Sequence, residues 1–130
     1  MANIMALDDV MDATKLIKKI LEKKGHKVAI FSEEDDAIAY VKDNPIDLAI
    51  LDIKLKKMSG VDVLEELKKA QPDIRAIMLT GYPTVETARR SLTLGAAEYL
   101  VKPIDKSELE EKVASVLKGR KPSKTSIKVA

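Results

Sequence analysis

Short runs of hydrophobic residues alternate along this chain with longer segments in which hydrophobic positions recur every three or four residues. Five such runs predict β-strands: NIMAL (3–7), KVAIF (27–31), DLAILD (47–52), RAIMLT (75–80) and EYLV (98–101). The segments after the runs predict amphipathic helices. The first helix has Ala13, Leu16, Ile17, Ile20 and Leu21 on one hydrophobic face. The fourth is marked by Val85, Ala88 and Leu92.

Strand and helix alternate strictly, and the predicted strands are hydrophobic on both faces. This pattern predicts a parallel sheet that is covered by helices on both sides. Because connections between parallel strands are right-handed, few topologies remain. We therefore predict an α/β fold with an open, doubly wound, five-stranded parallel sheet.

Length and composition restrict the class of protein further. The chain has 130 residues, of which 45% are hydrophobic and 34% charged, as expected for one globular domain. No apolar run has the length of a membrane span and no signal-peptide pattern opens the chain, so we expect a cytoplasmic protein. The absence of cysteine excludes thiol nucleophiles and disulfides. The single histidine, His26, excludes two-histidine zinc motifs, and we interpret it as an exposed residue before a strand.

The formal net charge of +2 is unevenly distributed. The segment 119–130 contains four basic residues and no acid, which leaves 19 basic and 21 acidic residues in the remainder. We therefore divide the chain into a domain at 1–118 and a basic C-terminal tail at 119–130, which we expect to be flexible. Docking of this tail on an acidic or nucleic-acid surface is the less favoured alternative.

Polar residues lie at the carboxyl ends of the predicted strands. Asp8 and Asp9 follow the first strand, Asp52 and Thr80 end the third and fourth, and Lys102 follows the fifth. Ligands of open parallel sheets bind beyond these ends. Three neighbouring carboxylates repel one another and favour a hard cation with oxygen ligands, for which Mg²⁺ is the best candidate. One aspartate can then attack phosphorus, while Lys102 and Thr80 supply a charge and a donor for phosphoryl oxygens.

In these residues and their spacing, the chain resembles the receiver domains of bacterial two-component response regulators. The resemblance spans about residues 3–118 and rests on MALDD, LAILDIKL with MSG, IMLTGY and AAEYLVKP, in that order. It implies the flavodoxin-like strand order 2-1-3-4-5. It also implies a phosphorylatable signalling switch of a phosphorelay, served by a sensor histidine kinase or a histidine phosphotransfer protein. Such a domain is a phosphoacceptor that promotes its own phosphorylation and dephosphorylation, and not an enzyme with a separate substrate.

The resemblance further implies roles for the matching acidic residues. Asp52 corresponds to the phosphoacceptor and is also expected to be a Mg²⁺ ligand. Asp8 and Asp9 correspond to the acidic pair at the Mg²⁺ site, with Asp9 as the direct ligand and Asp8 acting largely through water. The main-chain carbonyl of Lys54 is a further expected metal ligand.

Three other residues match the switch machinery of the family. Thr80 is similar to the hydroxyl that moves toward the phosphoryl group, and Lys102 to the lysine that pairs with it. Tyr99 holds the position of the aromatic switch, although a lone tyrosine in a strand is more often a packing residue. The bond between Lys102 and Pro103 is cis in such domains.

The loop after Asp52 departs from the family pattern. Lys56 stands where proline is frequent, and Leu55 replaces a frequent methionine. Lys54 and Tyr82 hold the two positions whose side chains tune dephosphorylation in the family. We predict that the phosphoryl lifetime differs from that of an average member, and the sequence leaves the direction of the difference open.

The resemblance also implies output by contact with a downstream protein, through the surface from Pro83 to Lys118. A phosphorylation-dependent dimer is compatible with it, and we expect no binding of nucleic acid or membrane by this domain. A natural stand-alone protein and a receiver taken from a longer regulator look alike in this sequence.

Three alternatives stay open. They are an aspartate-nucleophile phosphatase or phosphotransferase of the haloacid-dehalogenase type, a flavodoxin-like cofactor carrier, and a receiver that acts as a scaffold without phosphorylation. The first would place a D-x-D pair after its first strand, where this chain has adjacent aspartates, and the segment at Asp52 reads D-I-K. The sequence DDVMDATK is not the phosphate loop of the second, and the complete set of site residues disfavours the third.

Overall fold

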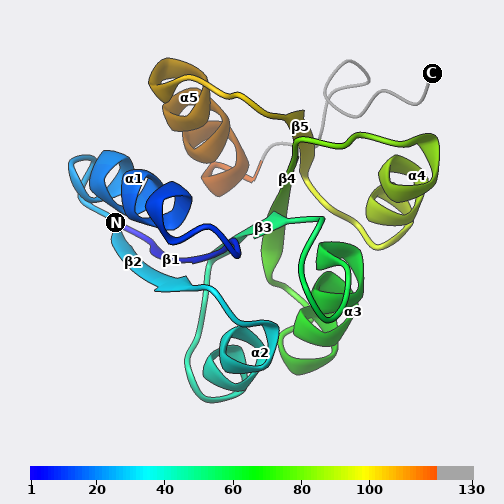
Figure 1. Cartoon of the computed structure of the whole chain (residues 1–130). Helices are drawn as coiled ribbons and strands as arrows, with labels where there is room; N and C mark the ends of the chain where they lie inside the picture. Colours follow the sequence, from blue (N-terminus) through cyan, green and yellow to red (C-terminus); the bar gives the residue numbers. More distant parts are fainter. Residues whose placement is uncertain (120–130) are drawn as a thin grey trace.

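The computed structural model describes residues 1–119 as five strands that alternate with five helices (Figure 1). The strands are β1 (Asn3–Leu7), β2 (Lys27–Phe31), β3 (Leu48–Asp52), β4 (Arg75–Thr80) and β5 (Glu98–Val101). The helices are α1 (Met11–Glu22), α2 (Glu34–Asp43), α3 (Gly60–Ala70), α4 (Val85–Thr93) and α5 (Lys106–Leu117). All five predicted strands are present, and only β3 differs in its bounds, by one residue. The predicted tail lies outside the described residues except for Gly119.

The strands form one parallel sheet in the order β2-β1-β3-β4-β5. The predicted doubly wound fold and its strand order are therefore confirmed. β1 lies inside the sheet, since Ile4 pairs with Val28 on one side and with Leu48 on the other. The chain moves outward from β1 to β2 and then returns to β3 on the opposite side of β1. The strand order thus reverses between β1 and β3, where ligands of such sheets bind.

Successive residues of the central strands point to opposite faces of the sheet and build two hydrophobic layers. On β3, Leu48 and Ile50 belong to the layer with α1 and α5, whereas Ala49 and Leu51 belong to the layer with α2, α3 and α4. Figure 1 shows these two groups of helices on the two sides of the sheet. β3 is buried along its whole length, which explains its uninterrupted hydrophobic run.

The predicted hydrophobic faces of two helices are only partly buried. Leu16 of α1 is 58% exposed, while Val85 and Leu92 of α4 are 41% and 52% exposed. In α1 the buried stripe runs through Thr14, Ile17 and Leu21, and a residue one position from Ile17 lies about 100° around the helix. The hydrophobic period therefore located the helices correctly but overestimated the width of their buried faces.

Two further features concern residues away from the sheet's carboxyl ends. His26 is half-buried and not exposed as predicted, because its Nδ1 accepts a hydrogen bond from the backbone N–H of Ala2 at 3.2 Å. It precedes β2 and so lies at the opposite end of the sheet from the strand-end aspartates.

Among residues 1–119, none of the helices combines the length and the apolar character that crossing a bilayer requires.

Candidate functional site

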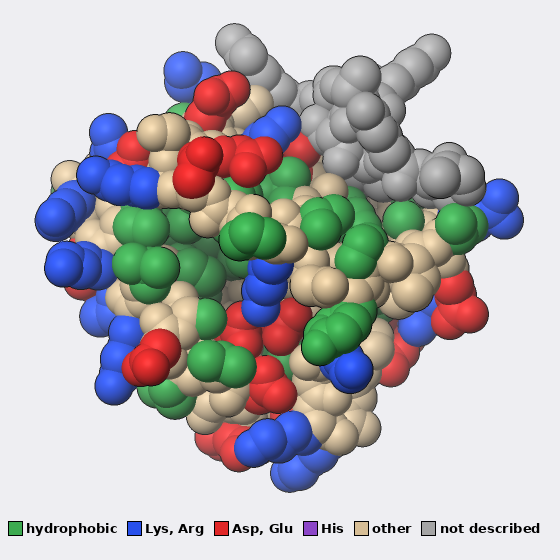
Figure 2. Space-filling model, turned by 45° about the horizontal axis from the view of Figure 1, so that its top comes forward, with side chains coloured by type: hydrophobic (Ala, Val, Ile, Leu, Met, Phe, Trp, Pro, Cys, Tyr) green, Lys and Arg blue, Asp and Glu red, His purple; other side chains and the backbone are tan. Residues whose placement is uncertain are grey.

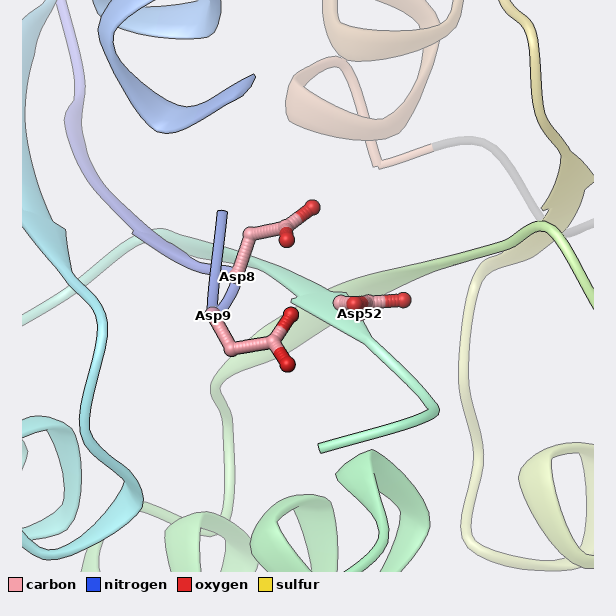
Figure 3. A group of neighbouring side chains, drawn as sticks. All are labelled: Asp8, Asp9 and Asp52. Carbon is pink, nitrogen blue, oxygen red and sulfur yellow. The ribbon is translucent and has the colours of Figure 1, made fainter. Parts of the chain in front are cut away.

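The three strand-end aspartates lie together at the point where the strand order reverses. Asp8 and Asp9 directly follow β1, and Asp52 is the last residue of the neighbouring β3. One carboxylate oxygen from each of the three lies within 4.8 Å of the others. Figure 3 shows the three side chains at the ends of these two strands. Such a set of oxygen atoms suits a hard cation such as Mg²⁺.

Lys102 connects this acidic cluster to β5. Its Nζ donates a hydrogen bond to Oδ2 of Asp8 at 2.7 Å and lies 3.6 Å from Oδ1 of Asp52. The other oxygen of Asp8 accepts the backbone N–H of Val10 at 2.9 Å, so both oxygens of this buried carboxylate are bonded. The peptide bond between Lys102 and Pro103 is cis, as the resemblance implies. The lysine thus balances part of the charge of two aspartates at once.

The charges at the site change the proton affinity of its members. Burial raises the pKa of Asp52 to about 6, the negative charge of Asp8 adds to this, and Lys102 opposes it. Burial alone would lower the pKa of Lys102, but its hydrogen bond to Asp8 and the charge of Asp52 outweigh burial and raise it. Lys102 is therefore charged near neutral pH. When Asp52 is ionised, it is repelled by the neighbouring carboxylates. A bound cation would relieve this repulsion, so the arrangement favours cation binding.

The cluster opens into a cavity of about 350 Å³. Its lining includes the three aspartates and Lys102, together with Lys54, Lys56 and Tyr82 from two loops. The ammonium group of Lys54 lies 4.0 Å from the centre of the Tyr82 ring, a cation–π contact between the β3–α3 and β4–α4 loops. Figure 2 shows acidic side chains in a hollow that basic and hydrophobic side chains surround. A small anionic group can reach Asp52 through this cavity.

Thr80 is not part of this cavity. It is completely buried, and its hydroxyl oxygen accepts the backbone N–H of Tyr82 at 2.9 Å. It lines a neighbouring cavity of about 510 Å³ that lies between the β3–α3 loop and the start of α4. A movement of the hydroxyl from this second cavity toward Asp52 would join the two sites.

Tyr99 is buried on the α4 side of the sheet. Its hydroxyl is 2.7 Å from the Thr87 hydroxyl and accepts the backbone N–H of Thr84 at 3.3 Å. Thr84 caps α4 through the backbone N–H of Thr87. The tyrosine therefore contacts the first turn of α4, the helix that follows the Thr80 loop. The sequence suggested Tyr99 as a switch residue, but nothing in it indicated that Thr84 and Thr87 would be its partners.

The β3–α3 loop is held at its end by a glycine and a helix cap. Gly60 donates its N–H to the carbonyl of Ile53 at 2.7 Å, and a Cβ at this position would collide with the Asp52 carbonyl group. Ser59 and Asp62 then form a capping box at the start of α3. The spacing of Ser59 and Asp62 is a recognisable cap signal in the sequence, and the close approach to Asp52 explains why glycine follows it.

One buried acid beside this loop was not predicted from the sequence. The side chain of Glu34, the first residue of α2, accepts the backbone N–H groups of Lys57 and Met58. Four consecutive acids occupy positions 33–36, and nothing local in the sequence distinguishes the one that is buried.

The response regulator receiver domain family matches residues 4–114 of this chain. The chain belongs to that family. The transcriptional regulatory protein ZraR of Salmonella typhimurium is 32% identical over 115 residues, which are 88% of this chain and 26% of ZraR. The chemotaxis protein CheY of Treponema pallidum is 32% identical over an alignment of 118 residues, which covers 88% of this chain and 82% of CheY. This chain therefore spans about a quarter of the ZraR relative and most of the CheY relative.

Solved structures agree with this assignment. A CheY-like receiver domain protein from Methanospirillum hungatei JF-1 is 34% identical, with a TM-score of 0.89 over 92% of this chain and 95% of that one. The receiver is a phosphorylatable signalling switch of a two-component system, and the phosphatase, cofactor-carrier and scaffold alternatives are not favoured. Domains of this family bind Mg²⁺ at an acidic pocket and work with histidine kinases or phosphotransfer proteins; here three aspartates form such a pocket.

Proposed function

We propose that Asp52 is the phosphoacceptor of this receiver. Together with Asp8, Asp9 and the main-chain carbonyl of Lys54, it would also hold Mg²⁺. One observation carries the proposal. Asp52 ends a completely buried central strand, faces two further carboxylates and a lysine, and still borders an open cavity. A carboxylate in this position can act as a nucleophile on a phosphoryl group that enters from the cavity.

In the proposed reaction, an oxygen of the Asp52 carboxylate attacks the phosphorus of a phosphohistidine on the donor protein. A P–O bond forms, the P–N bond breaks, and the imidazole leaves with its electron pair and takes up a proton. Bound Mg²⁺ would supply positive charge to the phosphoryl oxygens. Lys102 lies close enough to Asp52 to pair with the same oxygens, so the chain itself promotes both its phosphorylation and the later attack by water.

The signal is proposed to leave the site through Thr80 and Tyr99. The Thr80 hydroxyl would move toward the new phosphoryl group, and Tyr99 touches the start of the α4 helix, which follows that loop. The output surface would be the segment from Pro83 to Lys118, where Leu92 and Val101 expose hydrophobic side chains to a downstream protein or to a second receiver. We further propose that the domain works in the cytoplasm.

Intact-protein mass after incubation with acetyl phosphate tests the assignment of Asp52. We expect one added phosphoryl group in the wild type, only when Mg²⁺ is present, and none in Asp52→Asn. Asp43→Asn is the matched control, because Asp43 is exposed and lies at the far end of α2, and it should be phosphorylated like the wild type.

Borohydride reduction followed by peptide mapping should then find the reduced side chain at position 52. A mass gain that persists in Asp52→Asn, or a reduced residue elsewhere, would show that the assignment is wrong. If acetyl phosphate leaves the wild type unchanged, the same measurement with a phosphorylated histidine kinase as donor decides the question.

A further inference from the structure

A buried carboxylate from α2 contacts the loop that follows Asp52. Glu34 is only 1% exposed, and its Oε2 accepts the backbone N–H of Lys57 at 2.5 Å and that of Met58 at 3.0 Å. Burying a charged group is unfavourable unless hydrogen bonds compensate it. Although burial by itself raises the pKa of Glu34, the backbone N–H groups outweigh this and lower it, so the side chain is ionised at neutral pH. The contact is therefore a pair of charge-assisted hydrogen bonds.

The two hydrogen bonds to Glu34 restrain the middle of the β3–α3 loop, before its end at Gly60. The end of the loop is fixed by the hydrogen bond from Gly60 to the Ile53 carbonyl. Residues 54–58 lie between Ile53 and Gly60. Residues 54–56 line both cavities, and Lys57 and Met58 line only the one that contains Thr80. Lys56 stands where a proline, with its fixed φ angle, would restrict this part of the chain. In this chain the restraint comes from outside the loop, through Glu34.

We propose that Glu34 is a positioning residue for the phosphorylation site, which holds the β3–α3 loop so that the main-chain carbonyl of Lys54 stays beside Asp52. The inference rests on the proposed function, because it assigns that carbonyl to the Mg²⁺ site. It predicts that Glu34 acts mainly on metal affinity. The reaction itself depends on Asp52 and Lys102, which Glu34 does not touch.

The first test is Mg²⁺ binding by calorimetry, without any phosphoryl donor. Glu34→Leu fills the same buried space but accepts no hydrogen bond, and we expect its dissociation constant for Mg²⁺ to rise about tenfold, as for other groups that orient metal ligands. Asp35→Ala is the matched control. It removes an acid from the same helical turn that contacts the exposed Lys57 ammonium at 3.4 Å, but it leaves both backbone bonds intact. This control should bind Mg²⁺ like the wild type.

Two further readouts separate positioning from general loss of structure. At saturating Mg²⁺, Glu34→Leu should recover most of the wild-type phosphorylation rate. Amide exchange of the peptide covering residues 54–58 should be faster in Glu34→Leu and unchanged in Asp35→Ala. If Glu34→Leu does not fold, Glu34→Gln replaces it. Its neutral amide oxygen keeps a weaker acceptor, so we expect the Mg²⁺ dissociation constant to rise about two- to threefold.

The outcomes are distinct for the two proposals. Wild-type Mg²⁺ affinity and amide exchange in Glu34→Leu, or in Glu34→Gln where that variant is needed, would overturn the role of Glu34. Equal losses in Glu34→Leu and Asp35→Ala would also overturn it. Failure of Asp52 to accept a phosphoryl group would instead refute the proposed function. The calorimetry and exchange experiments would still report on the loop in that case.

Discussion

Asp52→Asn is expected to make the metal-free protein more stable at neutral pH. The pKa of Asp52 is about 6, against 3.8 for an ordinary aspartate, so its ionised form is disfavoured in the folded state. Since one pKa unit corresponds to 1.36 kcal/mol, this difference corresponds to about 3 kcal/mol. The asparagine is uncharged and nearly the same shape. Because it must still find hydrogen bonds in a buried position, we expect a gain of about 1 to 3 kcal/mol in the free energy of unfolding.

The sign of the effect follows from proton binding. Between pH 3.8 and about 6, the folded wild type holds the Asp52 proton more tightly than the unfolded chain does. The contribution of the protonated Asp52 to the stability of the folded wild type is therefore fully present below pH 3.8 and is lost as the pH rises through about 6. The substituted asparagine is uncharged at every pH, so the advantage of Asp52→Asn should be small at pH 4 and complete at pH 8. Acids that lie away from Asp52 titrate alike in both proteins and cancel in the comparison.

Urea denaturation followed by far-UV circular dichroism suits this measurement, because the chain contains no tryptophan. It should be run in EDTA at pH 4 and pH 8, and again at pH 8 with Mg²⁺. Mg²⁺ stabilises a folded protein that binds it. It should therefore raise the free energy of unfolding of the wild type more than that of Asp52→Asn, and so reduce the difference in stability between the two proteins. A variant no more stable than the wild type at pH 8 in EDTA, or an advantage that persists at pH 4, would refute the electrostatic reasoning.

Two further predictions concern the loops around the site. Gly60→Ala should lower the free energy of unfolding by about 1 to 3 kcal/mol, because its Cβ would meet the backbone of Asp52, whereas Gly81→Ala, whose Cβ meets nothing within 4 Å, should change it little; thermal denaturation of both variants gives the comparison. Tyr82→Leu and Lys54→Met should each shorten the phosphoryl lifetime about two- to fivefold. The cation–π contact between these side chains holds them over the cavity and limits the access of water, and an exposed contact of this kind is worth about 0.5 to 1 kcal/mol. Decay of the phosphorylated mass after removal of the donor measures this, and purely additive effects in the double variant would argue against a paired action.

The strands were the most predictable part of the fold. A central parallel strand is buried on both faces, so β3 and β4 appear in the sequence as uninterrupted hydrophobic runs that polar residues end. Helix faces were less predictable, as Leu16 and Leu92 show, because the hydrophobic period does not reveal how wide a stripe the sheet covers. Which side chains of a helix remain exposed depends on tertiary packing, and no local sequence pattern encodes that packing.

The candidate site was predictable only to the extent that topology determines it. Parallel strands bring their carboxyl ends to one edge, so the convergence of Asp8, Asp52 and Lys102 followed from strand ends alone. Side-chain direction did not follow from it, and Thr80 lies in the neighbouring cavity although it ends the adjacent strand. Glu34 could not be found at all, since its partners are backbone N–H groups 23 and 24 residues away.

If Thr80 acts as proposed, its hydrogen bonds limit the size of the switch that phosphorylation can drive. In the described structure the Thr80 oxygen accepts the N–H of Tyr82, and Lys102 donates to Asp8 and lies farther from Asp52. Moving the hydroxyl would exchange a neutral hydrogen bond, of about 1 kcal/mol, for one to a charged phosphoryl oxygen, of about 1.5 to 3 kcal/mol. The net gain of about 0.5 to 2 kcal/mol corresponds to a shift of about two- to thirtyfold between two conformations, far below the roughly 10⁴-fold that a complete reversal needs. Phosphorylation at Asp52 should therefore bias the output surface, and a partner that binds one conformation is needed to complete the change.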